Sequence, residues 1–231
     1  MKNQKVQDGL MKHAWLLMLV AFLGIGSYGQ EIAIDWGNIM EVATTYFAVP
    51  SSENALRFYN ALPKVQVQIK NEEEAFSKVN SYIFSNLVLL EKQVLKADRN
   101  SVKVAVRLWT IADGAFAEDL SDMLGQLIQI APKMFLEETR DFPWSYHGHE
   151  GFLEWLKEGH IVCNGGVLGG EVEYDEQAVR AELLRRIQAL ETVKEKDLME
   201  FRDICINIIK QHIPKHMNSA GSPCAGQKGQ V

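Results

Sequence analysis

The apolar residues of this chain recur in steps of three and four, and this periodicity constrains the fold more than any other feature. Between Asn71 and Ala97 they form one continuous stripe, which a chain buries as an amphipathic α-helix. The stripe consists of Phe76, Val79, Ile83, Leu87, Leu90 and Val94. Asn71 is a favourable N-cap, and the three glutamates after it suit the positive end of a helix dipole. The pattern predicts one long helix here.

Four shorter helices are expected around it. Two precede it, over Asn38–Val49 and from Ser51 or Ser52 to just before Pro63. Two more follow Asp175, and their stripes again step by three and four residues. The first stripe consists of Val179, Leu183, Ile187 and Leu190, and the second of Leu198, Phe201, Ile204, Cys205, Ile208 and Ile209.

The segment after Asp98 or Asn100 is apolar around most of a helix, as expected of a helix buried between neighbours. Its polar positions form a narrow seam of Lys103, Arg107 and Thr110. Asp113-Gly114 breaks this helix, and Pro132 ends or kinks the next one. The apolar face of that next helix consists of Leu120, Met123, Leu124, Leu127 and Ile128.

Two short segments favour β-structure. Val65–Ile69 alternates strictly between apolar and polar residues, which predicts a short half-buried strand. Asn164-Gly165 stands between two apolar stubs within 161–168, which is typical of a two-residue hairpin. The expected fold is therefore mainly α: an irregular helical bundle or stacked helical pairs with a small β-hairpin insertion.

The stretch from Asn100 to Glu138 resembles one helical pair of the HEAT or armadillo type. It combines a buried helix, the Asp113-Gly114 turn and a second helix that ends in Ile130-Ala131-Pro132-Lys133-Met134-Phe135. The resemblance covers about a sixth of the chain and rests on periodicity. It implies an α-α superhelix that serves as an interaction scaffold.

The N-terminus has the pattern of a cleavable secretory signal peptide. Three lysines precede an apolar run from Ala14 to Ile25, and small residues follow at Ser27 and Gly29. We expect cleavage after Gly29 and a secreted or periplasmic protein, with Met11 as an alternative start. The run is too short for a membrane anchor, which needs about 20 residues, although a buried core helix is an alternative interpretation.

The expected organisation is a signal peptide over 1–29, one mainly helical domain over 30–212 and a disordered tail over 213–231. Residues 141–174 form an aromatic and glycine-rich insertion within the domain. Residues 1–29 hold three lysines and one aspartate, so their removal changes the formal charge of the chain from −6 to −8. Such a charge disfavours nucleic acids and anionic membranes, and it would attract a basic partner, although it also simply keeps a protein soluble.

Three cysteines, an odd number, allow one disulfide and one thiol, or no disulfide. Cys205 lies among isoleucines, which predicts a buried, inert thiol. Cys163 and Cys224 are the pair that the sequence favours for a bridge.

The strongest candidate for chemistry is a cluster of zinc-type ligands: His147, His149, Glu150, His160 and Cys163. A zinc ion held there would activate a bound water for hydrolysis. The spacing matches no established zinc signature, and an ordinary exposed loop explains the same residues. Neighbouring aromatic residues either line a cleft for a glycan or peptide or pack the loop onto the core. They are Phe142, Trp144, Tyr146, Phe152 and Trp155.

Other motifs of catalysis are missing from the sequence, which has no nucleophile elbow, phosphate-binding loop or Cys-x-x-Cys pair. His212 lies on an apolar stripe and is expected to be a satisfied histidine. Acidic pairs such as Glu118-Asp119 are expected at helix starts or on solvated faces. We therefore expect an exported, non-enzymatic helical protein that binds another macromolecule, most simply a protein, without a cofactor. A secreted metal-dependent hydrolase and a ligand-binding protein with an aromatic cleft are the alternatives.

Overall fold

The computed structural model of the 231-residue chain describes residues 34–63, 73–109, 111–112, 114–140, 161–163 and 176–218. Ile34 belongs to an N-terminal unit that ends there, and the rest lies in a second unit, Asp35–Val231. Its described helices are α2 (Trp36–Ala48), α3 (Ser52–Ala61), α4 (Glu73–Ser85), α5 (Leu87–Val94), α6 (Arg99–Trp109), α7 (Gly114–Ile130), α8 (Pro132–Arg140), α10 (Glu176–Glu191) and α11 (Met199–Asn218). The fold is mainly α, and the described ranges contain no strand.

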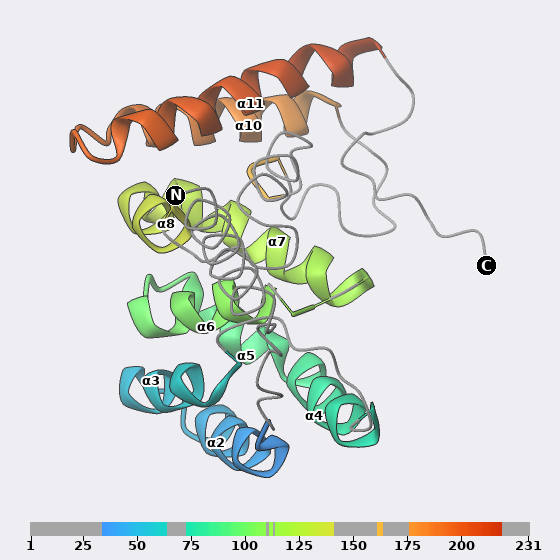
Figure 1. Cartoon of the computed structure of the whole chain (residues 1–231). Helices are drawn as coiled ribbons and strands as arrows, with labels where there is room; N and C mark the ends of the chain where they lie inside the picture. The colour runs from blue at the N-terminus through green and yellow to red at the C-terminus, as the bar shows by residue number, and fades with distance from the viewer. Residues whose placement is uncertain are drawn as a thin grey trace, which may run out of the picture. The chain divides into compact units, whose positions relative to one another are not determined.

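The helices pack in succession along the chain (Figure 1). α2 packs on α3 and α4, and α3 packs on α6; α7 then contacts α6, α8 and α10, and α10 packs on α11. Pro132, which the sequence predicts to end or kink a helix, is the first residue of α8. The arrangement is one of packed helix pairs, and it is compatible with a helical-repeat-like fold.

α6 is buried on nearly every side, as its sequence predicts. It packs against α3, α5, α7 and α8. Five apolar residues of its second and third turns are buried: Val102, Val104, Ala105, Val106 and Leu108. Asp98 rather than Asn100 caps it, because its Oδ1 accepts hydrogen bonds from the Ser101 amide and hydroxyl at 2.8 and 2.7 Å.

The same cap joins α6 to α2. The Tyr46 hydroxyl of α2 lies 3.0 Å from the Ser101 hydroxyl, so a buried chain of hydrogen bonds runs from Tyr46 through Ser101 to Asp98. Burial raises the pKa of Tyr46 to about 12, which keeps its hydroxyl protonated. The buried hydroxyls of Tyr46 and Ser101 are therefore both satisfied.

The long helix expected over 71–97 is instead two helices, α4 and α5. Asn86 separates them: its side chain donates a 2.9 Å hydrogen bond to the Tyr82 carbonyl, and its amide bonds to Ile83 instead of Tyr82. Asparagine competes with the helix for backbone groups in this way. The predicted stripe is still buried on both sides of the break, at Val79, Ile83, Leu87, Leu90 and Val94.

Two further expectations need correction. Ile161–Cys163, the first stub of the expected hairpin, is a buried turn and not a strand. The rest of the hairpin and the strand expected at 65–69 lie outside the described residues. α11 continues to Asn218, past residue 213, where the tail was expected to begin.

The stripes of the other helices are buried as predicted. On α7 and α10 every expected position is buried, and on α11 all except Ile204, which is partly exposed.

α5 ends in a left-handed residue that is not glycine. Ala97 has φ 57°, and around it the Asp98 amide bonds to the Gln93 carbonyl and the Ala97 amide to the Val94 carbonyl. These two bonds define a Schellman motif, in which glycine normally occupies the left-handed position because it has no Cβ to clash.

We predict that Ala97→Gly stabilises the protein by about 0.5–1 kcal/mol, because it removes the strain of a left-handed alanine. Urea denaturation followed by helical circular dichroism measures the change. The matched control is Ala181→Gly, on the exposed face of α10, which we expect to destabilise the protein by about 1 kcal/mol. Equal losses in both variants would contradict the prediction.

Candidate functional site

Most of the residues singled out from the sequence lie outside the described residues. This holds for His147, His149, Glu150 and His160 of the expected metal site, and for Phe142, Trp144, Tyr146, Phe152 and Trp155 of the expected cleft. Cys163 is described, and it is buried. Among described residues no group of three or more His, Cys, Asp or Glu is placed to hold a metal ion. Both sites stay predictions from sequence.

The described cysteines, Cys163 and Cys205, are both buried. Cys224 lies outside the described residues, so the bridge from Cys163 to Cys224 stays a prediction from sequence. Burial raises the pKa of the Cys205 thiol far above its usual range, so the expectation of an inert thiol is confirmed. His212 is buried as well, with its Nδ1 2.9 Å from the Ile208 carbonyl oxygen, and is satisfied as expected.

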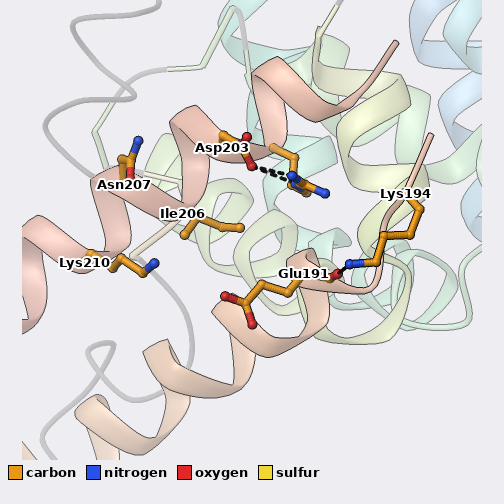
Figure 2. A pocket seen from close by; sticks show the side chains of 7 residues that line it. Glu191, Lys194, Asp203, Ile206, Asn207 and Lys210 are labelled. Atoms are coloured by element: carbon orange, nitrogen blue, oxygen red, sulfur yellow. Dashed lines mark hydrogen bonds and ion pairs between the residues drawn. The ribbon is translucent and has the colours of Figure 1, made fainter. Parts of the chain in front are cut away.

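A pocket of about 520 Å³ lies between α10 and α11 (Figure 2). It is lined by Glu191, Lys194, Arg202, Asp203, Ile206, Asn207 and Lys210. Two of its cations already have partners: Arg202 bonds to Asp203 at 2.6 Å and to the Val193 carbonyl at 2.7 Å, and Lys194 bonds to the Glu191 carbonyl at 2.6 Å. Arg202 is therefore held by the protein itself, and the lining combines charges of both signs, with Lys210 and Glu191 beside it.

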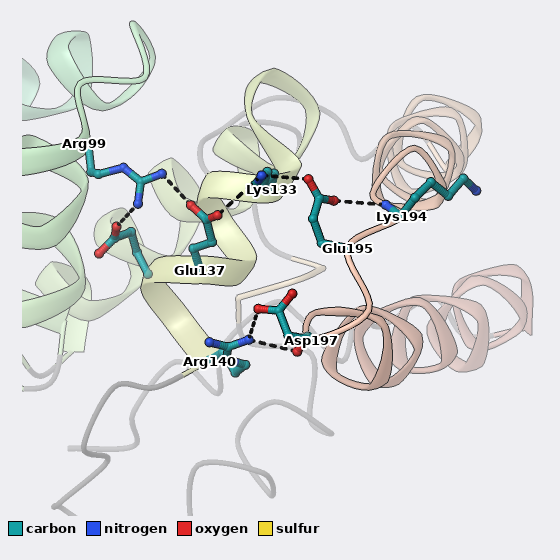
Figure 3. A network of polar contacts seen from close by, with 8 residues as sticks. Arg99, Lys133, Glu137, Arg140, Lys194, Glu195 and Asp197 are labelled. Carbon is teal, nitrogen blue, oxygen red and sulfur yellow. Dashed lines mark hydrogen bonds and ion pairs between the residues drawn. The ribbon is translucent and has the colours of Figure 1, made fainter.

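A network of ion pairs links α6, α8 and the segment between α10 and α11 (Figure 3). Arg99 pairs with Glu137 and Glu138, while Lys133 pairs with Glu195 at 2.7 Å. Arg140 pairs with Asp197 at 3.0 Å. Most of these side chains are well exposed, so each pair contributes little free energy and the network mainly fixes the register between helices.

Arg186 of α10 is the one fully buried charged side chain among the described residues. Its Nη1 donates to the Val162 carbonyl at 2.9 Å, and its Nε and Nη2 donate to Oε1 of Glu182 at 3.2 and 3.1 Å. Glu182 also accepts a hydrogen bond from Gln129 of α7. The Glu182–Arg186 pair therefore connects α7, α10 and the 161–163 turn. Burial lowers the pKa of Arg186, and the negative charge of Glu182 opposes this shift.

Next to this pair, four carboxylates from two helices come close together. The pKa of Asp122, on α7, is raised to about 6, chiefly by burial and then by the charge of Asp119. Glu118 and Glu91 of α5 raise this pKa by smaller amounts, whereas the cation of Arg186 lowers it. The pKa of Asp119 is also raised, by burial and by Glu118. The effect of Arg186 is thus outweighed at Asp122 by burial and by the neighbouring carboxylates.

Two exposed apolar side chains lie close to Glu91 along the chain, and Val88 is three residues before it on α5. Phe84 and Val88 are 43% and 53% exposed, and they lie one turn apart across the α4–α5 junction. The Phe84 ring meets that of Phe116, in the first turn of α7, edge to face at 5.7 Å. We define the α5–α7 face as Phe84, Val88, Glu91, Glu118, Asp119 and Asp122. Its apolar and acidic parts are joined on α5, where Val88 and Glu91 are three residues apart, and on α7, where Phe116 is three residues before Asp119.

Comparison of the chain with protein-family models, with curated proteins and with solved structures finds no match. The helical pairing seen here is therefore not assigned to a family, and the resemblance to HEAT or armadillo repeats stays a prediction. In the part of the chain that the structure describes, no helix is both long and apolar enough to cross a membrane.

Sequence reasoning missed the α5–α7 face. Glu118, Asp119 and Asp122 share one side of α7 with Gln126 and Gln129, at helical spacing, and that polar stripe is readable from the sequence. The approach of Glu91 from another helix is not readable, because it depends on how α5 packs on α7. Exposure of Val88 depends on the same packing.

We predict that Glu182→Gln destabilises the protein by about 3 kcal/mol, because it removes the hydrogen-bonded counter-charge of the buried Arg186. A double-mutant cycle with Arg186→Met, measured by urea denaturation, should show a coupling energy of about 1–3 kcal/mol. Glu53 and Arg57 provide a matched control: they have the same spacing and a 2.6 Å contact but are largely exposed. Their coupling should stay below about 0.5 kcal/mol. Equal coupling in the two pairs would refute the structural role of Arg186.

We also predict that Asp122→Asn stabilises the protein near pH 7.5, by about 1 kcal/mol after allowance for solvent screening. The folded pKa of Asp122, about 6, is above the ordinary aspartate value of 3.8 that applies in the unfolded chain. Its contribution to stability is therefore fully present below pH 3.8 and is lost as pH rises through 6. The stability difference between variant and wild type should grow between pH 4 and pH 7 in denaturation experiments. A difference independent of pH would contradict the assignment.

Proposed function

We propose that this is an exported, non-enzymatic helical protein that binds another protein through its helical surface, and that the α5–α7 face is the surface used. The observation that carries the proposal is the exposure of Phe84 and Val88 beside the carboxylates of α7. Neighbouring exposed apolar side chains with a polar rim are typical of protein interaction sites. The export part rests on the signal-peptide pattern in residues 1–29.

Features elsewhere in the described chain support this surface over the alternatives. The lining of the α10–α11 pocket mixes cations and carboxylates, and the side chains of the ion-pair network are paired with one another. The alternatives of a zinc hydrolase and of an aromatic cleft depend on residues 142–160, which lie outside the described residues. In this proposal the packed helices serve as the scaffold that presents the binding surface, as the HEAT or armadillo resemblance implies.

Site-specific photo-crosslinking in the cells that encode the protein tests the proposal. We expect benzoylphenylalanine at position 88 to capture a defined partner that mass spectrometry identifies repeatedly. The control is position 49, also an exposed valine, at the end of α2. We expect no such adduct there. Absence of an adduct at position 88, or the same adducts at both positions, would count against the proposed function.

A further inference from the structure

The carboxylates of the α5–α7 face carry a negative charge that no ion pair between described residues neutralises. None of Glu91, Glu118, Asp119 and Asp122 takes part in an ion pair within the described ranges. The one cation that acts on Asp122 is Arg186. Its buried guanidinium already donates hydrogen bonds to Glu182 and to the Val162 carbonyl in the interior of the protein. Two of the four carboxylates, Glu118 and Asp119, are exposed and accessible to a partner.

The same face offers apolar contact beside that charge. Phe84 and Val88 are one helical turn apart, and one side of the Phe84 ring packs against the edge or face of the buried Phe116 ring. A ring held in this way keeps one side fixed and presents the other to solvent. Burying it under a partner would release water from apolar surface, at about 25 cal/mol for each Å² removed from solvent.

Charge complementarity decides which partner fits. Cations brought near the four carboxylates would relieve their mutual repulsion, whereas an acidic partner would add to it. An amphipathic helix places basic and apolar side chains on adjacent faces at the three- and four-residue spacing that this surface presents. The formal charge of −6 on the whole chain also favours approach of a basic partner.

We infer that the α5–α7 face binds a basic amphipathic helix of a partner protein, with its lysines or arginines on the α7 carboxylates and its apolar side chains on Phe84 and Val88. This inference rests on the proposed function and specifies its partner chemistry. The acidic cluster alone would not select a helix; the adjoining apolar pair does so.

Fluorescence anisotropy with labelled peptides tests it on the full chain. The probe is a helical peptide of lysine and leucine in amphipathic order. One comparison peptide replaces every lysine with glutamate, and another replaces every leucine with serine. We expect the lysine–leucine peptide to bind about tenfold or more tightly than either comparison peptide, and its affinity to fall as salt increases. Equal binding of the serine peptide would reduce the site to a non-specific charge effect and overturn the inference.

Matched variants locate the binding. Glu118→Gln with Asp119→Asn should weaken the lysine–leucine peptide about tenfold and reduce its salt dependence, because both side chains are exposed members of the face. Glu41→Gln with Glu200→Gln, exposed on α2 and α11, removes the same charge elsewhere and should leave affinity unchanged. Val88→Ser should weaken binding, and Val49→Ser should not. Equal effects of face and control variants would overturn the inference.

The crosslinking experiment separates the two claims. An adduct at position 88 that persists undiminished in the Glu118→Gln, Asp119→Asn variant would overturn the basic-helix inference and leave the proposed function standing. A missing adduct at position 88 would remove the proposed function itself.

Discussion

The arrangement of this protein depends on burying α6. A helix that is apolar around most of its circumference is stable in water only when other helices cover it, and α3, α5, α7 and α8 do so. Each covering helix turns its apolar stripe inward, and this fixes which of its residues face outward. The polar stripe of α7 and the exposed side of α5 therefore come together as a consequence of covering α6. The candidate binding face follows from core packing.

Much of the core could be predicted because apolar residues at helical spacing lie on the side of a helix that is buried. Positions such as Leu90, Leu127 and Leu183 are buried where the stripes predict. The break at Asn86 was not predicted, because it depends on the competition of one side chain for a backbone carbonyl. Arg107 shows another limit: it belongs to the expected polar seam, yet it is buried over the Tyr59 ring at 4.9 Å and donates to the Tyr59 hydroxyl. Long side chains cover apolar neighbours in ways that periodicity does not reveal.

The candidate site was less predictable than the fold. Sequence reasoning concentrated on ligand-type residues between 142 and 163, of which Cys163 alone is described, as a buried thiol. The α5–α7 face arises instead from residues that are ordinary one by one. Glu118 and Asp119 suit a helix start, and Val88 adjoins a predicted stripe. Their significance comes from their arrangement in space: burial first, and then the neighbouring carboxylates, raise the pKa of Asp122 to about 6, which lowers stability at neutral pH. A partner that neutralises these carboxylates would offset the loss of stability, which gives the unfavourable cluster a functional explanation.

The central claim is that the α5–α7 face, and not the protein surface in general, receives a basic apolar helix. Methyl NMR of valine-labelled protein during titration with the lysine–leucine peptide tests it most directly. Val88 and Val49 are both well exposed and lie on different helices, α5 and the end of α2. The account predicts saturable shifts of the Val88 methyl signals while those of Val49 stay in place. Shifts of equal size at both valines, or none at Val88, would contradict it.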